Sequence, residues 1–213
     1  MDFQEETMSK TLKKIIIYIL SVLMIFSTGC GKDNDKNNSV KAEDVVLWGC
    51  PSTEKVLKDK PIEDYLGIMT EPEIQILMAK NEYENGQIII SAKENVPYYN
   101  ASISDLALEG GDAVISKENI DVLVAKYLTV NITYQTNGAP KGSYPDALVP
   151  MSAIDKFEEN KISEDTNQAI YIRVQTSLEQ PAGIYKGTLS INFSSFVESV
   201  PVIVSVMEVA VSE

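Results

Sequence analysis

Two pairs of glutamates are the first side chains in this sequence to test as the acid–base pair of a glycosidase. Glu71 and Glu73 form one pair, and Glu82 and Glu84 lie two residues apart in the segment 80–87 (KNEYENGQ). Most glycoside hydrolases cleave the glycosidic bond with a pair of carboxylates that flank it. If the segment 80–87 is extended, however, its two glutamates point to one face of a strand, where nothing in the sequence predicts burial. We therefore expect solvated charges at a strand edge and assign no catalytic residue.

The composition removes most other catalytic chemistry. The chain contains no histidine and a single arginine, Arg173. Without imidazole there is no Ser-His-Asp or Cys-His nucleophile, no histidine metal site and no proton shuttle near neutral pH. A clamp of several arginines around a phosphate or carboxylate is also excluded. The sequence thus predicts neither a metal nor a cofactor.

The charge balance bears on partners. With 31 acidic and 18 basic residues, the formal net charge is −13. Nucleic-acid binding needs clustered lysines and arginines that displace counterions, so we expect no nucleic-acid partner. Direct adhesion to anionic lipid headgroups is disfavoured for the same reason. Solubility accounts for the acidic surface.

One proline-punctuated segment is a candidate partner-facing loop. Tyr144 and Asp146 lie in the segment 143–148 (SYPDAL), where an aromatic ring and a carboxylate suit a loop that reaches toward another molecule. Capping of a turn by Asp146 is the alternative. Together with Glu82, these two residues are the predicted partner-facing or glycan-facing positions. The ten tyrosines and Trp48 could stack on sugars, although core packing is expected for most of them.

The N-terminus has the pattern of an export signal. Lys10, Lys13 and Lys14 precede an apolar run at 15–26, which small residues follow. The run is shorter than the roughly 20 residues that a membrane-spanning helix needs. Gly29-Cys30 resembles the lipobox of bacterial lipoproteins, although Ser27 occupies a position where that pattern prefers leucine.

The lipobox resemblance implies that residues 1–29 are removed and that Cys30 is lipidated. Two acyl chains would anchor the protein stably at the extracytoplasmic face of the bacterial cell membrane. An ordinary cleaved secretory peptide is the alternative. If Cys30 carries lipid, the remaining cysteine, Cys50, has no partner for an intramolecular disulfide, and we expect it to be a small buried hydrophobic residue.

Residues 30–43 are polar and without periodicity, which predicts a flexible tether. Asp33, Asp35 and Asn37 alternate as calcium ligands do, but the glycine and the closing glutamate of an EF-hand loop are missing. We therefore interpret this stretch as a linker rather than a metal site.

From residue 44 to residue 213 the pattern is that of an all-β domain. Runs rich in β-formers occur at 45–48, 73–78, 87–92, 98–106, 122–133, 168–176, 183–193 and 200–209. Turns are predicted at Asn85-Gly86, Gly110-Gly111, Asn137-Gly138 and 181–183, and short helices at 53–58 and 152–159. About eight strands without alternating helices predict a two-sheet β-sandwich of the jelly-roll or immunoglobulin-like kind.

Four segments together resemble the N-terminal β-sandwich domain of glycoside hydrolase family 123 and related glycosidase-like proteins. They are 79–87 (AKNEYENGQ), 144–150 (YPDALVP), 167–172 (NQAIYI) and 181–188 (PAGIYKGT). Their order and spacing fit the family pattern over about residues 44–210. Lys80 replaces an arginine of the pattern, and Ile170-Tyr171 falls where the pattern often has tryptophan.

In that family the sandwich precedes a (β/α) barrel whose Asp-Glu pair cleaves N-acetylgalactosamine glycosides with the help of the substrate. The chain stops at Glu213, about where the linker into the barrel would begin, so the resemblance carries over no catalytic residue. It implies a non-catalytic module of a surface glycan-processing lipoprotein, which supports a missing barrel or presents a glycan-binding or protein-binding surface. Two other classes stay open: a structural, adhesin-like subunit, and a self-contained glycoside hydrolase.

Overall fold

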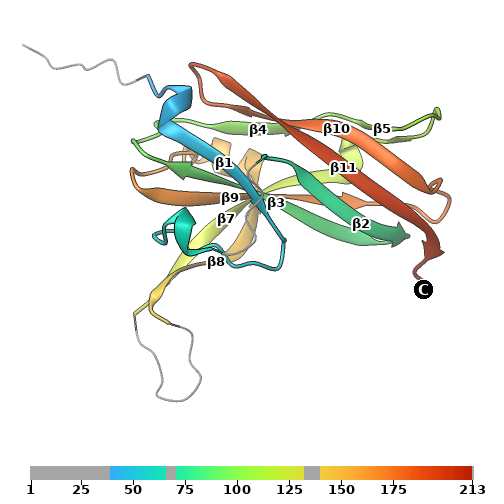
Figure 1. Ribbon diagram of the computed structural model, residues 1–213, viewed down its shortest axis with the longest axis horizontal. Coiled ribbons are helices and arrows are strands. Elements are labelled where there is room, and N and C mark those ends of the chain that lie inside the picture. The colour runs from blue at the N-terminus through green and yellow to red at the C-terminus, as the bar shows by residue number, and fades with distance from the viewer. Residues whose placement is uncertain (1–38, 66–70, 132–139, 213) are drawn as a thin grey trace, which may run out of the picture. The chain divides into compact units, whose positions relative to one another are not determined.

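The computed structural model describes residues 39–65, 71–131 and 140–212 (Figure 1). The predicted signal, Cys30, most of the predicted tether and the predicted turn at Asn137-Gly138 lie outside these residues. Residues 39–213 form one compact unit with its own core, so we expect this part to fold alone. Val40, at the end of the predicted tether, is already buried in that core. No helix in the described ranges is long and apolar enough to cross a membrane.

The unit is a sandwich of two β-sheets, as predicted from the sequence (Figure 1). Sheet A consists, in spatial order, of β1 (Val45–Cys50), β3 (Tyr83–Ala92), β9 (Thr166–Gln175), β7 (Ile120–Val130) and β8 (Gly142–Pro150). Sheet B consists of β2 (Ile74–Lys80), β11 (Val197–Ala210), β10 (Gly183–Asn192), β5 (Leu106–Leu108) and β6 (Val114–Ile115), and β4 (Asn100–Ile103) also pairs with β10. Neighbouring strands are antiparallel except for β2 and β11, which run parallel.

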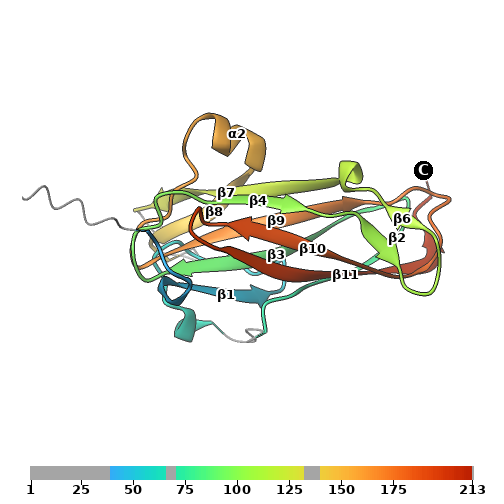
Figure 2. The same ribbon diagram turned by 90° about the horizontal axis from the view of Figure 1, so that it is seen from above.

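Short helical elements complete the unit. They are the 3-10 turns η1 (Ala42–Asp44), η2 (Ile62–Asp64) and η3 (Lys117–Asn119), and the helix α2 (Met151–Lys156). Helix α2 lies beside the strands in Figure 2, where it contacts β7 and β8 of one sheet and β4 of the other. It buries Met151 and Ile154 against the end of the core, and it confirms the helix predicted at 152–159.

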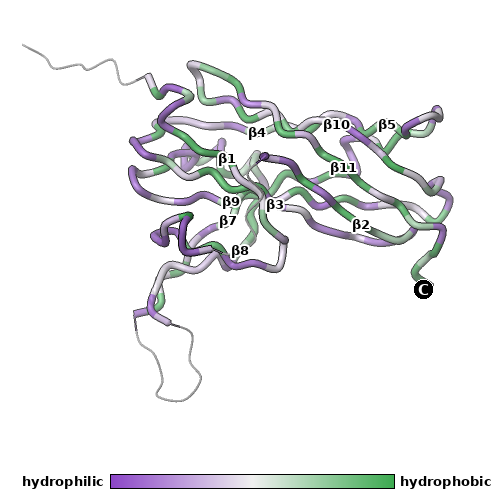
Figure 3. The backbone as a smooth tube through the Cα atoms, viewed as in Figure 1, coloured by the Kyte–Doolittle hydropathy of each residue, from purple (hydrophilic) through white to green (hydrophobic). Residues whose placement is uncertain are grey.

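Sheet A buries apolar side chains on both of its faces. Its central strands contain runs of consecutive hydrophobic residues, and neighbouring residues in a strand point to opposite faces. The inter-sheet core lies between the sheets, and its fully buried members include Ile88, Ile90, Ile170, Ile172, Leu189 and Val202. The outer cluster lies on the opposite face of sheet A and consists of Trp48, Cys50, Val56, Tyr65, Ile89, Leu123, Ala125, Ala169 and Tyr171. Figure 3 shows the apolar and polar stretches interleaved along the strands.

The outer cluster is covered by residues 51–65, which we call the roof segment. Val56 and Tyr65 contribute its apolar contacts. The predicted helix at 53–58 is wrong: this stretch is irregular. Its backbone is bonded to sheet A instead, since Lys58 N donates to Ser143 O (2.9 Å) and Asn167 N donates to Lys58 O (2.7 Å).

Two further sequence predictions need correction. The segment around Tyr144 and Asp146 is not a loop but edge strand β8. The Asn85-Gly86 pair lies inside β3, and the chain turns earlier, at Asn81, whose φ is 58°. Leu128 is 59% exposed. The register of β7 and β8 shifts just before it, at Lys126/Tyr127.

Candidate functional site

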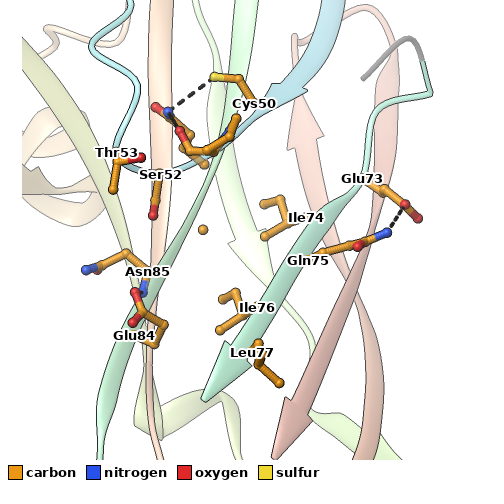
Figure 4. Close-up of a pocket in the computed structure, with 13 residues that line it drawn as sticks. Cys50, Ser52, Thr53, Glu73, Ile74, Gln75, Ile76, Leu77, Glu84 and Asn85 are labelled. Carbon is orange, nitrogen blue, oxygen red and sulfur yellow. Dashed lines mark hydrogen bonds between the residues drawn. The ribbon is translucent and has the colours of Figure 1, made fainter. Parts of the chain in front are cut away.

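A groove of about 510 Å³ lies beside β2, β3 and the start of the roof segment (Figure 4). Its walls differ in chemistry. Ile74, Ile76 and Leu77 of β2 line one side in Figure 4, and the side chains of Ser52, Thr53 and Glu84 lie across from them, whereas the side chain of Asn85 points away. The groove is therefore amphipathic, with an aliphatic wall and a polar wall.

Gly86 keeps the two walls at this separation. It lies on β3 between the polar residues, and a Cβ atom added to it would overlap the side chain of Ile74 on β2. Strands β2 and β3 belong to different sheets, so glycine permits a close approach of the two layers at this point. The close approach of the two sheets therefore accounts for the glycine of the Asn85-Gly86 pair, which the sequence predicted to be a turn.

Gln87 is the most buried polar residue of the groove, at 2% exposure. Its Nε2 donates to the backbone oxygens of Pro51 and Glu54 and lies 3.2 Å from Cys50 Sγ. Reversing the amide would place Oε1 against those two carbonyl oxygens, so the donors fix its orientation. Gln87 thus holds the roof segment by its nitrogen, while its oxygen remains unused.

Two buried acceptors in the groove have no hydrogen-bond partner. They are Asn85 Oδ1 and Gln87 Oε1, the side-chain atoms of this kind found in the described part of the chain. Both residues have odd numbers in β3, so their side chains leave the same face of the strand. Buried acceptors in native proteins are nearly always paired, and each unpaired one calls for an explanation.

The groove continues toward β8. A second hollow of about 450 Å³ shares Ser52, Thr53, Glu84 and Asn85 with the first, and it is also lined by Pro145, Asp146, Leu148 and Tyr171. Asp146 is the extra residue of a bulge: Lys126 pairs with Ala147 and Tyr127 pairs with Pro145, which leaves Asp146 without a partner across the ladder. We refer to the two hollows together as the β3 groove.

The charges of the β3 groove are mainly negative. Glu73, Glu84 and Asp146 line it, against one basic residue, Lys55. Burial raises the pKa of the Cys50 thiol to about 12, and the nearby carboxylate of Glu54 adds to the shift. The thiol is therefore protonated at neutral pH and is no nucleophile. The surface can accept hydrogen bonds from a neutral or cationic ligand and repels an anion.

The three predicted partner-facing residues do not come together. Asp146 lines the β3 groove, whereas Glu82 and Tyr144 do not. Glu82 Oε2 accepts from Ala79 N (2.5 Å) in the turn between β2 and β3. The Tyr144 hydroxyl donates to Pro140 O (2.9 Å) beside its own strand. Both side chains stabilise local backbone.

Asn85 and Gln87 were missed by the sequence analysis. The Asn85-Gly86 pair predicts a turn, and Gln87 begins the predicted strand at 87–92. A glutamine directly before three isoleucines in GQIII was the available signal, because a polar side chain within a buried run needs partners. Among the described residues, no three acidic or cysteine side chains converge on a metal-sized site.

Comparison with known proteins identifies the family. The glycoside hydrolase 123 N-terminal domain matches residues 71–193, which include β2 to β10. The chain belongs to this family. The match covers β3 and β8, and thus most of the β3 groove. No curated protein matches the sequence.

A solved family 123 enzyme has a similar fold. A family 123 glycoside hydrolase from Clostridium perfringens, described as hydrolysing glycolipid glycans, superposes with a TM-score of 0.64 at 17% identity, over 78% of this chain. At this identity the likeness shows the fold alone. This family 123 chain spans 28% of the length of that enzyme. The CooA pilin subunit from enterotoxigenic Escherichia coli gives a TM-score of only 0.33 at 14% identity, over 77% of this chain and 99% of the pilin, and carries no argument.

Proposed function

We propose that residues 39–213 are a non-catalytic N-terminal module of a glycan-processing protein, which supports a catalytic barrel or presents a surface to a glycan or a protein. The observation that carries the proposal is the family match over residues 71–193. In the solved family 123 enzyme, a similar sandwich makes up 28% of the chain. This supports a role as one domain of a larger protein.

The carboxylates support the non-catalytic part of the proposal. A glycosidase acid must keep its proton near neutral pH, and enzymes achieve this by placing the acid in an apolar, buried environment. No aspartate or glutamate in the described ranges is buried. Glu82 is engaged by a backbone amide, and Glu84 Oε1 accepts from the backbone N of Asn85 (2.8 Å).

The test is turnover by the purified module. Residues 39–213 are incubated with 4-nitrophenyl N-acetyl-β-galactosaminide and with glycolipid-derived oligosaccharides. We expect no hydrolysis above the buffer rate. Hydrolysis that disappears in Glu84→Gln or Asp146→Asn, but persists in the matched groove-distant variant Glu118→Gln, would show a self-contained enzyme and overturn the proposal.

We also propose that the module is held at the extracytoplasmic face of a bacterial membrane by lipid on Cys30. The support is the Gly29-Cys30 pair after a basic and apolar N-terminus. Cells expressing the full chain and fed a palmitate analogue should label the wild type and Cys50→Ala, but not Cys30→Ala. Labelling that survives Cys30→Ala, or an unlabelled wild type, would refute the anchor.

A further inference from the structure

Strand β2 has one edge that the sandwich does not use. It is the last strand of sheet B in spatial order, and it pairs with β11 only. The backbone groups of successive residues in a strand point alternately to its two sides. Lys80 O accepts from Val211 N, on the β11 side, so the even-numbered residues of β2 bond β11. The backbone groups of Gln75, Leu77 and Ala79 therefore point to the opposite side.

This free edge faces the β3 groove and is closed at one end only. Ala79 N donates to Glu82 Oε2 (2.5 Å), and Ala79 O accepts from Thr176 Oγ1 (2.9 Å). Glu82 precedes β3 and Thr176 follows β9, so both partners belong to the side of sheet A. Within the described ranges, no hydrogen bond reaches the backbone N or O of Gln75 or Leu77 on this side. Two N–H donors and two carbonyl acceptors are thus left for another molecule.

Two other edge strands are protected against such pairing. Strand β8 contains Pro145, Pro150 and a bulge, and β6 is only two residues long. Prolines, bulges and short length are common devices that keep another chain from adding to a sheet edge. Strand β2 contains no proline, and its register with β11 is regular over residues 74–78. Its free edge is therefore open to strand addition.

We infer that the free edge of β2 binds an extended peptide segment of a partner protein, with alternating aliphatic and lysine side chains, as an added strand of sheet B. In this mode of recognition, backbone hydrogen bonds give affinity and the surroundings of alternate side chains give specificity. The inference rests on the proposed function, in which the module presents a surface, and it names the kind of partner.

The geometry of the edge suits a strand. Gln75 and Leu77 are about 7 Å apart along β2, which is the repeat of a second extended chain. The adjoining hollow of about 510 Å³ gives room for the added backbone (Figure 4). Side chains on the inner face of an added strand would lie next to Ile74 and Ile76, which belong to the inter-sheet core. Aliphatic side chains are therefore expected at these positions.

The charges determine the other face of the added strand. Glu73 and Glu84 line the hollow, and none of its lining residues in the described part of the chain is basic. A lysine beside Glu73 forms an opposite-charge pair across neighbouring strands. Its apolar stem can also cover Leu77, which is 65% exposed. An acidic segment would be repelled.

The experiment is a titration of residues 39–213 with the fluorescein-labelled peptide KVKVKVK, followed by fluorescence anisotropy and amide hydrogen exchange. In the free module, the amides of Gln75 and Leu77 should exchange rapidly, while those of Ile76 and Met78 are protected by β11. The bound peptide should protect Gln75 and Leu77. The acidic peptide DVDVDVD should bind at least about tenfold more weakly.

Leu77→Pro is the decisive variant. It removes an N–H from the free edge without removing a bond to β11, and edge strands tolerate proline at such positions. It should weaken KVKVKVK binding at least about tenfold, because a hydrogen bond is lost and the ring obstructs the added strand. The matched control, Leu77→Ala, keeps the N–H and should bind within about threefold of the wild type.

A charge reversal tests the composition of the peptide and keeps the backbone of β2 intact. Glu73→Lys should weaken binding of KVKVKVK and strengthen binding of DVDVDVD. The control Glu118→Lys makes the same change in net charge at an exposed glutamate outside the groove, so it should affect neither peptide.

Four results would overturn the inference. They are no anisotropy change with KVKVKVK, equal losses of affinity in Leu77→Pro and Leu77→Ala, equal effects of Glu73→Lys and Glu118→Lys, and protection of Gln75 and Leu77 by N-acetyl-D-galactosamine but not by the peptide. Absent peptide binding contradicts the strand site alone. Release of nitrophenol from 4-nitrophenyl N-acetyl-β-galactosaminide by the same samples contradicts the non-catalytic role instead.

Discussion

The two faces of sheet A are covered in different ways. The inter-sheet core is closed by the regular strands of sheet B, and its members are mainly aliphatic side chains, with a few aromatic ones such as Tyr185, whose hydroxyl donates to Pro181 O (2.7 Å). The outer cluster is closed by the irregular roof segment, whose backbone is held by the side-chain amides of Gln87 and Asn167. A regular sheet packs against the first face, whereas an irregular segment held by side-chain hydrogen bonds covers the second. The β3 groove lies where those bonds begin.

Adjacent isoleucines on β3 give the sharpest test of this difference. Ile89 and Ile90 are both 0% exposed, and they point to the outer cluster and the inter-sheet core respectively. Ile90→Ala should lower the free energy of unfolding by about 2–5 kcal/mol, because two regular sheets cannot collapse onto the cavity. Ile89→Ala should cost less, since the roof segment can settle. Urea denaturation measures both, and an equal or reversed order would contradict the comparison.

Breaking the tie at Asn167 should open the roof segment. Its Nδ2 donates to Leu57 O (2.9 Å) and Lys60 O (2.7 Å), and its Oδ1 accepts from Ser91 Oγ (2.6 Å). Asn167→Leu should cost about 1–3 kcal/mol and shift the fluorescence of Trp48, whose indole donates to Ser91.

The control for Asn167→Leu is Thr176→Val. It removes another buried hydrogen bond, from Thr176 Oγ1 to Ala79 O (2.9 Å), far along the strand from the roof segment. It should lower stability while leaving the Trp48 emission of the folded state unchanged. A roof segment that stays closed in Asn167→Leu would show that apolar contacts suffice to hold it.

Alkaline pH should weaken the outer cluster. Burial raises the pKa of Cys50 from 9.0 to about 12, and burial likewise raises the pKa of Tyr65 and Tyr171 from 10.0 to about 12. Because the folded state favours the neutral forms, their contribution to stability is full below pH 9 and is lost as pH rises toward 12. Cys50 should become reactive to a thiol reagent over this range. Tyr171→Phe should move the loss of stability to higher pH. If the rate at which Cys50 reacts with the thiol reagent instead rises near pH 9, as for a free thiol, the prediction is wrong.

The smallest effect is expected at the bulge of β8. Asp146 is exposed, so Asp146→Ala should change the free energy of unfolding by less than about 0.5 kcal/mol in thermal denaturation. A loss above 1 kcal/mol would mean that the carboxylate holds the bulge, which would make its role structural.

Much of the sandwich was predictable, because runs of apolar residues with strand periodicity indicate where most strands of both sheets lie. Strand β8 was missed because prolines at 145 and 150 are typical of loops; an edge strand with a bulge tolerates them. The turn predicted at Asn85-Gly86 is wrong because glycine is favoured both in turns and where two sheets approach closely. Only the packing against Ile74 distinguishes them.

Less of the site was predictable. Asp146 was identified as facing outward from its setting in the sequence, although the bulge that places it there depends on a register shift in β7 and β8. The hydrogen bonds of Gln87 depend on the roof segment, whose Pro51 and Glu54 lie 36 and 33 residues away in the sequence. Such contacts leave no periodic trace in a sequence.

The parallel pairing of β2 with β11 constrains the order of assembly. Lys80 on β2 bonds Glu208 on β11 across 128 residues, and the two strands are in register from Ile74↔Val202 to Met78↔Val206. During synthesis β2 emerges early and waits with an unsatisfied backbone edge until β11 is made. Closure of this sheet is therefore a late, slow event, and an unfinished chain exposes a ready template for unwanted strand addition.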